Sequence, residues 1–169
     1  LSTEQIAALT TKAIPGLSSA QIDALNTEQA EALTPGLVAT MSSTQVGALS
    51  SADIATFSTA DIAAIGTAAI AGLSSASIGM LSSEQLAALT SSQVAALTSS
   101  QIQALTLTQI VGFTSTQIGA LSSTAISGLS TSTLAALTTD QIASLNPKAV
   151  AGLTTAQGEA LSSAQADAF

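Results

Sequence analysis

The chain has 169 residues, of which 47% are hydrophobic and only 7% are charged, and its ten acidic and two basic residues give a net charge of −8. It contains no cysteine or histidine, which excludes disulfides, thiolate zinc sites and catalysis or metal binding by histidine. Two lysines cannot form the basic patch that nucleic-acid binding requires, so we expect no nucleic-acid partner.

A transmembrane helix needs about 20 nearly uninterrupted apolar residues. Ser, Thr or Asn occurs every few residues throughout this chain, so we expect no membrane span. The chain opens on Leu1, without a basic segment followed by an apolar run. We therefore expect a piece of a longer protein, in which further repeats or domains of the same chain are its nearest partners.

Starting at Ser2, the chain divides into 21 octads without insertion or deletion, as in SSEQLAAL at 82–89. The eighth place is always Leu, Ile, Met or Phe, and the first is Ser, Thr or Asn in all octads but one, which has glycine. The fifth place is Ile, Val or Leu except at Ala30, Gly158 and Ala166. A repeat of this regularity predicts a solenoid, in which successive repeats stack on one another.

Every octad predicts one helix of about one and a half turns that begins after its first residue. Ser, Thr, Asn and Gly are preferred N-caps, and a glutamine three residues later completes a capping box. The Leu before each cap and the Ile four residues after it form a hydrophobic staple. Twelve octads carry the glutamine at the fourth place: Gln5, Gln21, Gln29, Gln45, Gln85, Gln93, Gln101, Gln109, Gln117, Gln141, Gln157 and Gln165.

Three prolines give further information along the chain. The first octad, 2–9, is followed at 10–17 by an octad with Pro15 inside its helix, where proline removes a helical hydrogen bond. We therefore expect a bent or shortened helix there. Pro35 and Pro147 instead occupy the first helical position, where proline is favoured. The weak fifth places of the last two octads predict a loosely packed C-terminus.

One long helix is a poor alternative, because eight residues rotate the pattern by about 80° per octad and the apolar stripe would leave the core. Isolated helices this short are unstable in water. The fold that we expect is therefore all-α, a superhelical solenoid of 21 short capped helices. Its core would be the fifth and eighth places, and the small seventh places would allow close approach of neighbouring backbones. A β-solenoid is the alternative, because Ile, Val and Thr favour strands.

We expect the whole chain, 1–169, to form a single solenoid domain, and a second period of seven octads runs through it. The phenylalanines mark this period at Phe57, Phe113 and Phe169. It divides the chain after Leu1 into three super-repeats, 2–57, 58–113 and 114–169. Two interpretations stay open: a tandem duplication without structural meaning, or seven octads that return the superhelix to an equivalent environment.

Charged residues occur only at the third, fourth and sixth places, which predicts a consistent solvent face. Glu28 with Glu31, and Asp53 with Asp61, are the candidate carboxylate pairs for glycoside hydrolysis, and Asp53 with Asp61 is also the candidate for a weak, exposed calcium site. We interpret all four as solvated surface acids and the abundant hydroxyls as caps, because no histidine can activate a serine. The sequence thus predicts no catalytic residue, no cofactor-binding residue, no metal ligand, no cofactor and no enzymatic activity.

The octads, for example LTSSQVAALTSSQIQAL at 89–105, resemble the Ser/Thr- and Ala-rich repeat tracts of large bacterial secreted or surface-anchored proteins of the adhesin-like, type I-secreted kind. The resemblance covers the whole chain and implies an acidic spacer, stalk or adhesive segment that is secreted or at the cell surface. It assigns no catalytic or binding residue. LSTEQIAAL at 1–9 is also similar to the helix starts of TAL-effector repeats, but the 34-residue unit and base-reading loop of those repeats are absent.

Together these features predict a non-enzymatic structural segment, a rigid spacer or scaffold within a larger protein. The alternative is a module in which ordered rows of Ser and Thr, chiefly the second-place hydroxyls, bind ice or an extracellular glycan surface.

Overall fold

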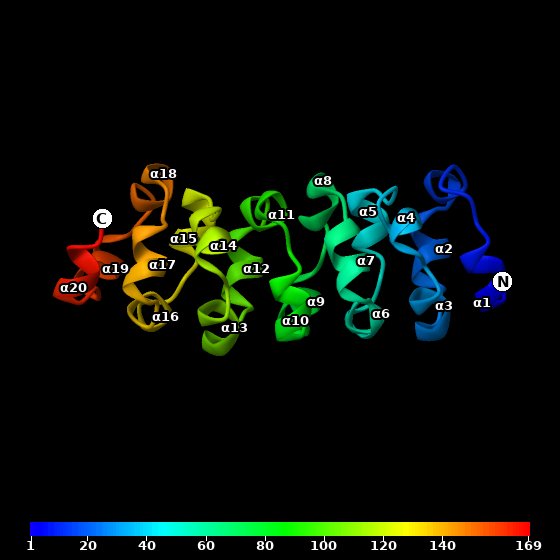
Figure 1. Cartoon of the computed structure of the whole chain (residues 1–169). Coiled ribbons are helices and arrows are strands. Elements are labelled where there is room, and N and C mark those ends of the chain that lie inside the picture. The colour runs from blue at the N-terminus through cyan, green and yellow to red at the C-terminus, as the bar shows by residue number, and fades with distance from the viewer. The chain divides into compact units, whose positions relative to one another are not determined.

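A computed structural model describes residues 1–169 and contains helices only. Twenty short α-helices and one 3₁₀ helix follow one another along the chain, with one helix in each octad and no strand (Figure 1). The predicted all-α fold built from octads is therefore confirmed, and the β-solenoid alternative is not adopted. The longest helices, α6 and α7, have six residues, and no helix is long and apolar enough to span a membrane.

The chain divides into two compact units, Leu1–Ala88 and Leu89–Phe169. The first contains α1 (Thr3–Ala7), the 3₁₀ helix η1 (Ile14–Gly16), α2 (Ser19–Asp23), α3 (Thr27–Glu31), α4 (Pro35–Val38), α5 (Ser43–Val46), α6 (Ser51–Thr56), α7 (Thr59–Ala64), α8 (Thr67–Ile70), α9 (Ser75–Gly79) and α10 (Ser83–Ala87). The second contains α11 (Ser91–Ala95), α12 (Ser99–Gln103), α13 (Leu107–Val111), α14 (Ser115–Gly119), α15 (Ser123–Ser127), α16 (Thr131–Ala135), α17 (Thr139–Ala143), α18 (Pro147–Val150), α19 (Thr155–Glu159) and α20 (Ser163–Ala166).

The helices begin where the caps predict. In α10, for example, the Ser82 hydroxyl accepts a hydrogen bond from the Gln85 backbone amide, and the Gln85 side chain accepts one from the Ser82 amide. All twelve predicted Gln capping boxes form in this way. Each box satisfies two amide groups that the start of a helix would otherwise leave without a partner.

The prolines also act as predicted. Pro35 is the first residue of α4 and Pro147 the first of α18. In the octad that contains Pro15, the α-helix is replaced by the three-residue 3₁₀ helix η1. The loss of one amide donor and the bulk of the ring explain why this octad alone lacks an α-helix.

In each unit, helices that are three octads apart pack against one another. The pairs in the first unit are α1–α3, α2–α5, α3–α6, α4–α7, α5–α8, α6–α9 and α7–α10, with η1 filling the octad between α1 and α2. Those in the second unit are α11–α14, α12–α15, α13–α16, α14–α17, α15–α18, α16–α19 and α17–α20. Neighbouring turns of both solenoid units therefore meet at a spacing of three octads or slightly more.

The fifth and eighth places form the core of both units, as predicted, and the fifth-place side chains of Ile54 and Ile118 are fully buried. Phe57 and Phe113 fill eighth places with 4% and 3% of their surface exposed, whereas Phe169 is 54% exposed. Gly158 and Ala166 are exposed at fifth places, in agreement with the looser packing predicted for the C-terminus. The fourth place is also buried in most octads, which the sequence analysis did not predict.

Candidate functional site

Several fourth-place glutamines in each unit form hydrogen bonds at both ends of the amide group. The Oε1 atom of Gln85 accepts from the Ser82 backbone amide at 2.8 Å, which caps α10. Its Nε2 atom donates to the carbonyl oxygens of Phe57, at 2.7 Å, and Ile54, at 3.3 Å, in the octad four positions earlier. The side chain is 6% exposed, so these bonds are shielded from water.

The same offsets recur in both units. Eighth-place carbonyl oxygens accept a hydrogen bond from Nε2 of the glutamine that lies 28 residues later, with Nε2–oxygen distances of 2.7 to 3.0 Å. The pairs are Gln45–Leu17, Gln117–Leu89, Gln141–Phe113, Gln157–Leu129 and Gln165–Leu137. Helices thus pack on the third octad back while the glutamines bond to the fourth. One turn of each solenoid unit therefore comprises between three and four octads.

The octad 146–153 has no glutamine at its fourth place, and its first residue makes the bond to the earlier turn instead. Its fourth place is Ala149, and its cap is Asn146. The Asn146 Oδ1 atom accepts the Ala149 amide, while Nδ2 donates to the carbonyls of Gly119, at 2.9 Å, and Leu121, at 3.2 Å. The amide group that bonds the two turns is therefore supplied from the first place instead of the fourth.

The interpretation of Asp53 and Asp61 as solvated surface acids is wrong. Both occupy fourth places and are buried, with 6% and 7% of their surface exposed. The Oδ2 atom of Asp61 accepts from the backbone amide and hydroxyl of Ser58, at 2.9 and 2.6 Å, and Asp53 bonds to Ser50 in the same way. These acids are capping residues, and the Asp61 Oδ1 atom is buried without a hydrogen-bond partner.

The remaining ten charged residues, at third and sixth places, are exposed as predicted. Glu28 and Glu31 lie on α3, and the structure brings no group of three or more acidic side chains together. Exposed Glu4 accepts a hydrogen bond from Ser2, which lowers the pKa of its carboxyl below the ordinary value. A lowered pKa means that this contribution to stability is present at neutral pH and is lost as the pH falls through the lowered value.

The hydroxyl groups divide into two classes. Nearly all first-place hydroxyls accept the amide of the fourth residue and are therefore engaged as caps; Thr34, before α4, is an exception. Second-place side chains such as Thr27 and Ser91 are exposed. The backbone of the second place, however, lies in the contact between turns: an added Cβ at Gly72 would clash with the Ser43 carbonyl oxygen, and one at Gly128 would lie 2.8 Å from that of Ser99.

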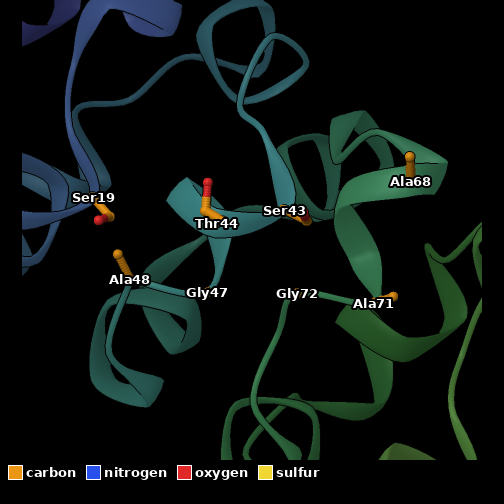
Figure 2. Close-up of a pocket in the computed structure, with 8 residues that line it drawn as sticks. All are labelled: Ser19, Ser43, Thr44, Gly47, Ala48, Ala68, Ala71 and Gly72. Atoms are coloured by element: carbon orange, nitrogen blue, oxygen red, sulfur yellow. The ribbon is translucent and has the colours of Figure 1, made fainter.

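An open groove of about 650 Å³ follows this contact in the first unit (Figure 2). It is lined by small side chains only: Ser19 of α2, Ser43 and Thr44 of α5, Ala68 of α8, and Gly47, Ala48, Ala71 and Gly72, which follow α5 and α8. No ionisable group lines it. The groove therefore offers hydroxyl and backbone hydrogen bonds but no acid, base or charged group for chemistry.

The sequence contained a signal for the second bond of the glutamines that the sequence analysis missed. Glutamic acid completes a capping box as well as glutamine does, and a negative charge is favoured at a helix start. Nevertheless glutamic acid occurs at no fourth place, although it occurs at third and sixth places such as Glu84 and Glu159. The use of glutamine in place of glutamic acid at these twelve places indicates that the hydrogen-bond donor of the amide group is favoured there.

The chain matches a known repeat family. The ALTTAQ repeat matches residues 1–35, 54–91, 80–107 and 110–147. Its six letters correspond to the seventh, eighth, first, second, third and fourth places, as in ALTTDQ at 136–141, so they contain the core residue, the cap and the glutamine. No curated protein matches the chain significantly. These matches confirm the repeat tract that the octads predict, and the chain belongs to the ALTTAQ repeat family.

Proposed function

We propose that this structural repeat segment is a rigid spacer or scaffold within a larger secreted or cell-surface bacterial protein. The observation that carries the proposal is the set of glutamine bonds between turns. Gln157 joins its own helix start to Leu129 in the previous turn, at 2.7 Å, and equivalent bonds recur through both units. Buried bonds of this kind hold each turn against the one before it, which opposes bending.

The surface chemistry agrees with a role that does not depend on a reactive site. The cap hydroxyls are engaged with backbone amides, and the groove of the first unit has no ionisable lining. The proposal therefore includes no enzymatic activity. A secreted or cell-surface location rests on the resemblance of the octads to repeat tracts of adhesin-like proteins.

Binding of ice or glycans is a weaker explanation of the same surface. A regular array needs hydroxyls that are free and project from one face. The first-place hydroxyls are caps, and the backbones of Ser43, Ser99 and Ser123 at second places lie against the next turn. No arrangement in the structure favours this alternative over the spacer.

Distance measurement by electron paramagnetic resonance tests rigidity directly, because the chain has no cysteine and spin labels attach only where cysteine is introduced. The variant Thr27→Cys/Thr139→Cys places labels at exposed second places in the two units. A rigid spacer gives one narrow distance distribution. The control pair Thr27→Cys/Ser83→Cys lies within the first unit and sets the width expected for a folded solenoid.

A pair across the two units whose distribution is as broad as that of the denatured chain would overturn the proposal. A broad distribution across the units with a narrow one inside the first unit would also overturn it, because the segment would then bend between its units.

A further inference from the structure

The octad 130–137, in the second unit, has a threonine at the fourth place where most octads have glutamine. Thr133 is buried, with 9% of its surface exposed, and its hydroxyl lies 2.8 Å from that of Ser130. A threonine side chain is shorter than that of glutamine, and no capping box forms at the start of α16. The amide group that other octads place between two turns is therefore missing from the chain here.

A hollow of about 290 Å³ lies beside Thr133, between its turn and the earlier one. Among its lining residues in the earlier turn are Ile102, Gln103 and Leu105. These three lie 31, 30 and 28 residues before Thr133, the same offsets at which Gln165 donates Nε2 to three backbone carbonyls. The hollow therefore coincides with the place that a glutamine amide occupies in other octads.

Backbone groups on both sides of this hollow lack a hydrogen-bond partner in the chain. The backbone amide of Ser130, which in a capping box would donate to the glutamine Oε1, donates to no group. The carbonyl oxygen of Leu105, which stands at the offset that accepts Nε2 elsewhere, accepts no hydrogen bond. Backbone groups without a partner cost free energy, which a bound molecule with the complementary groups recovers. The hollow thus presents one donor and one acceptor to a ligand.

A primary carboxamide is the chemical group that matches this donor and acceptor. The amide of Gln157 shows the arrangement in the same unit: its Oε1 atom accepts from the Thr154 backbone amide at 2.8 Å, and its Nε2 atom donates to the Leu129 carbonyl at 2.7 Å. A carboxylate would have no donor for the Leu105 carbonyl, and an ammonium group would have no acceptor for the Ser130 amide. No charged residue lines the hollow, so nothing there would pair with an ionic ligand.

We propose that the hollow beside Thr133 binds a primary carboxamide, either a small free amide or the side chain of a glutamine or asparagine from another chain. The carbonyl oxygen of the ligand accepts from the Ser130 amide, and its NH2 group donates to the Leu105 carbonyl. Its alkyl part contacts the apolar lining, which includes Ile110. The ligand thereby makes the bond between turns that the chain itself lacks in this octad. The proposal does not depend on the spacer function.

A nuclear magnetic resonance titration of the whole ¹⁵N-labelled chain with propionamide tests the site, because propionamide has the heavy atoms of a glutamine side chain. We expect a saturable shift of the Ser130 amide resonance, with a dissociation constant on the order of 10 mM because the ligand is small. Butanone is the matched control ligand. It has a methyl group in place of the NH2 group, so it should bind at least about tenfold more weakly.

Two variants test the position of the site. Thr133→Gln supplies the amide from the chain itself, so it should abolish the shift caused by propionamide and raise the thermal midpoint. The control Thr131→Gln adds the same side chain at an exposed second place of α16, and it should bind propionamide as the unmodified chain does.

Glycine pentapeptides with a central glutamine or a central glutamate distinguish the two sources of the amide. A saturable shift with the glutamine peptide and none with the glutamate peptide would show that the site accepts a side chain from another chain. Binding of propionamide without binding of either peptide would restrict the site to small free amides. Both results support a carboxamide site.

Three results would overturn the proposal: a Ser130 resonance that shows no saturable shift with propionamide, butanone that binds as tightly as propionamide, or undiminished binding of propionamide to Thr133→Gln. In each case narrow spin-label distances would still support the spacer function, so the two proposals fail separately.

Discussion

Replacing Gln85 by glutamate separates the two roles of a fourth-place side chain. The carboxylate still accepts the Ser82 amide, but it has no donor for the Phe57 carbonyl, which lies 2.7 Å from Nε2 in the structure. A buried carboxylate would then face a carbonyl oxygen. We expect the free energy of unfolding to fall by about 2–3 kcal/mol in urea denaturation followed by circular dichroism.

Gln21→Glu is the matched control, because Gln21 caps its helix in the same way but is exposed and bonds to no earlier turn. Its free energy of unfolding should change by less than about 0.5 kcal/mol. Equal losses in the two variants would show that the glutamines act only as caps.

Replacing Asp61 by glutamine tests the opposite change, in which a bond between turns is added. Its Oδ1 atom is buried without a partner, in the place where interior octads have a glutamine amide. Asp61→Gln restores the longer side chain, and by the interior offset its Nε2 would donate to the Leu33 carbonyl. We expect a gain of about 1 kcal/mol in the free energy of unfolding, measured by urea denaturation.

Asp23→Asn provides the comparison, because it removes one negative charge at an exposed sixth place without adding a bond between turns. A stabilisation of the same size in Asp23→Asn would attribute the gain at position 61 to charge alone.

At the scale of the helix, the close approach of turns sets which seventh places must be glycine. No residue has a positive φ, so glycine is not required by backbone conformation. A Cβ at Gly72 would clash with the Ser43 carbonyl oxygen, which is backbone and cannot move aside cheaply. Gly72→Ala should therefore lower the thermal midpoint by several degrees, corresponding to about 1–3 kcal/mol.

Gly16→Ala tests the same substitution where the space is open, because a Cβ there meets no atom within 4 Å. Its thermal midpoint should stay unchanged or rise. An unchanged thermal midpoint in Gly72→Ala would mean that the α5–α8 contact is looser than the structure shows.

The helix starts were predictable because their signals are local. Caps, capping boxes and prolines act within four residues, so the sequence contains the whole interaction at Ser82 and Gln85 or at Pro147. The burial of Asp53 was not predictable in this way, since it follows from contact with residues of an earlier turn. The number of octads in a turn likewise depends on packing between residues that are far apart in sequence.

At the scale of the whole molecule, helix contacts span three octads and glutamine bonds span three and a half, so seven octads make about two turns. Phe57 and Phe113, which are seven octads apart, meet equivalent neighbours, since their carbonyls accept from Gln85 and Gln141. The 28-residue separation between a glutamine and its acceptor carbonyl is the same for every octad that makes this bond, however. The seven-octad period therefore matches two turns, but the turns do not require it.

The octad register makes a prediction about insertions within the second unit. A complete octad inserted between Leu129 and Ser130 leaves an eighth-place carbonyl, although a different one, at the offset that Gln141 needs for its bond. A single alanine inserted there places a first-place residue at that offset. We expect the octad insertion to change the thermal midpoint little and the single alanine to lower it by several degrees, as measured by circular dichroism.

Two equally tolerated insertions would contradict this prediction, because they would mean that the bonds between turns do not depend on the octad register. Equal loss of stability in both would point instead to strain at the site of insertion.

The glutamines that bond one turn to the next all run in the same direction along the chain, and this direction is also the order of synthesis. Every bond between turns has its acceptor in the earlier turn and its donor in the later one, as in Gln45 with Leu17 and Gln165 with Leu137. During synthesis from the N-terminus, the acceptor carbonyls are therefore always made before their donors. A growing chain can add one octad at a time to a finished surface, so the repeat is suited to folding while it is still being made.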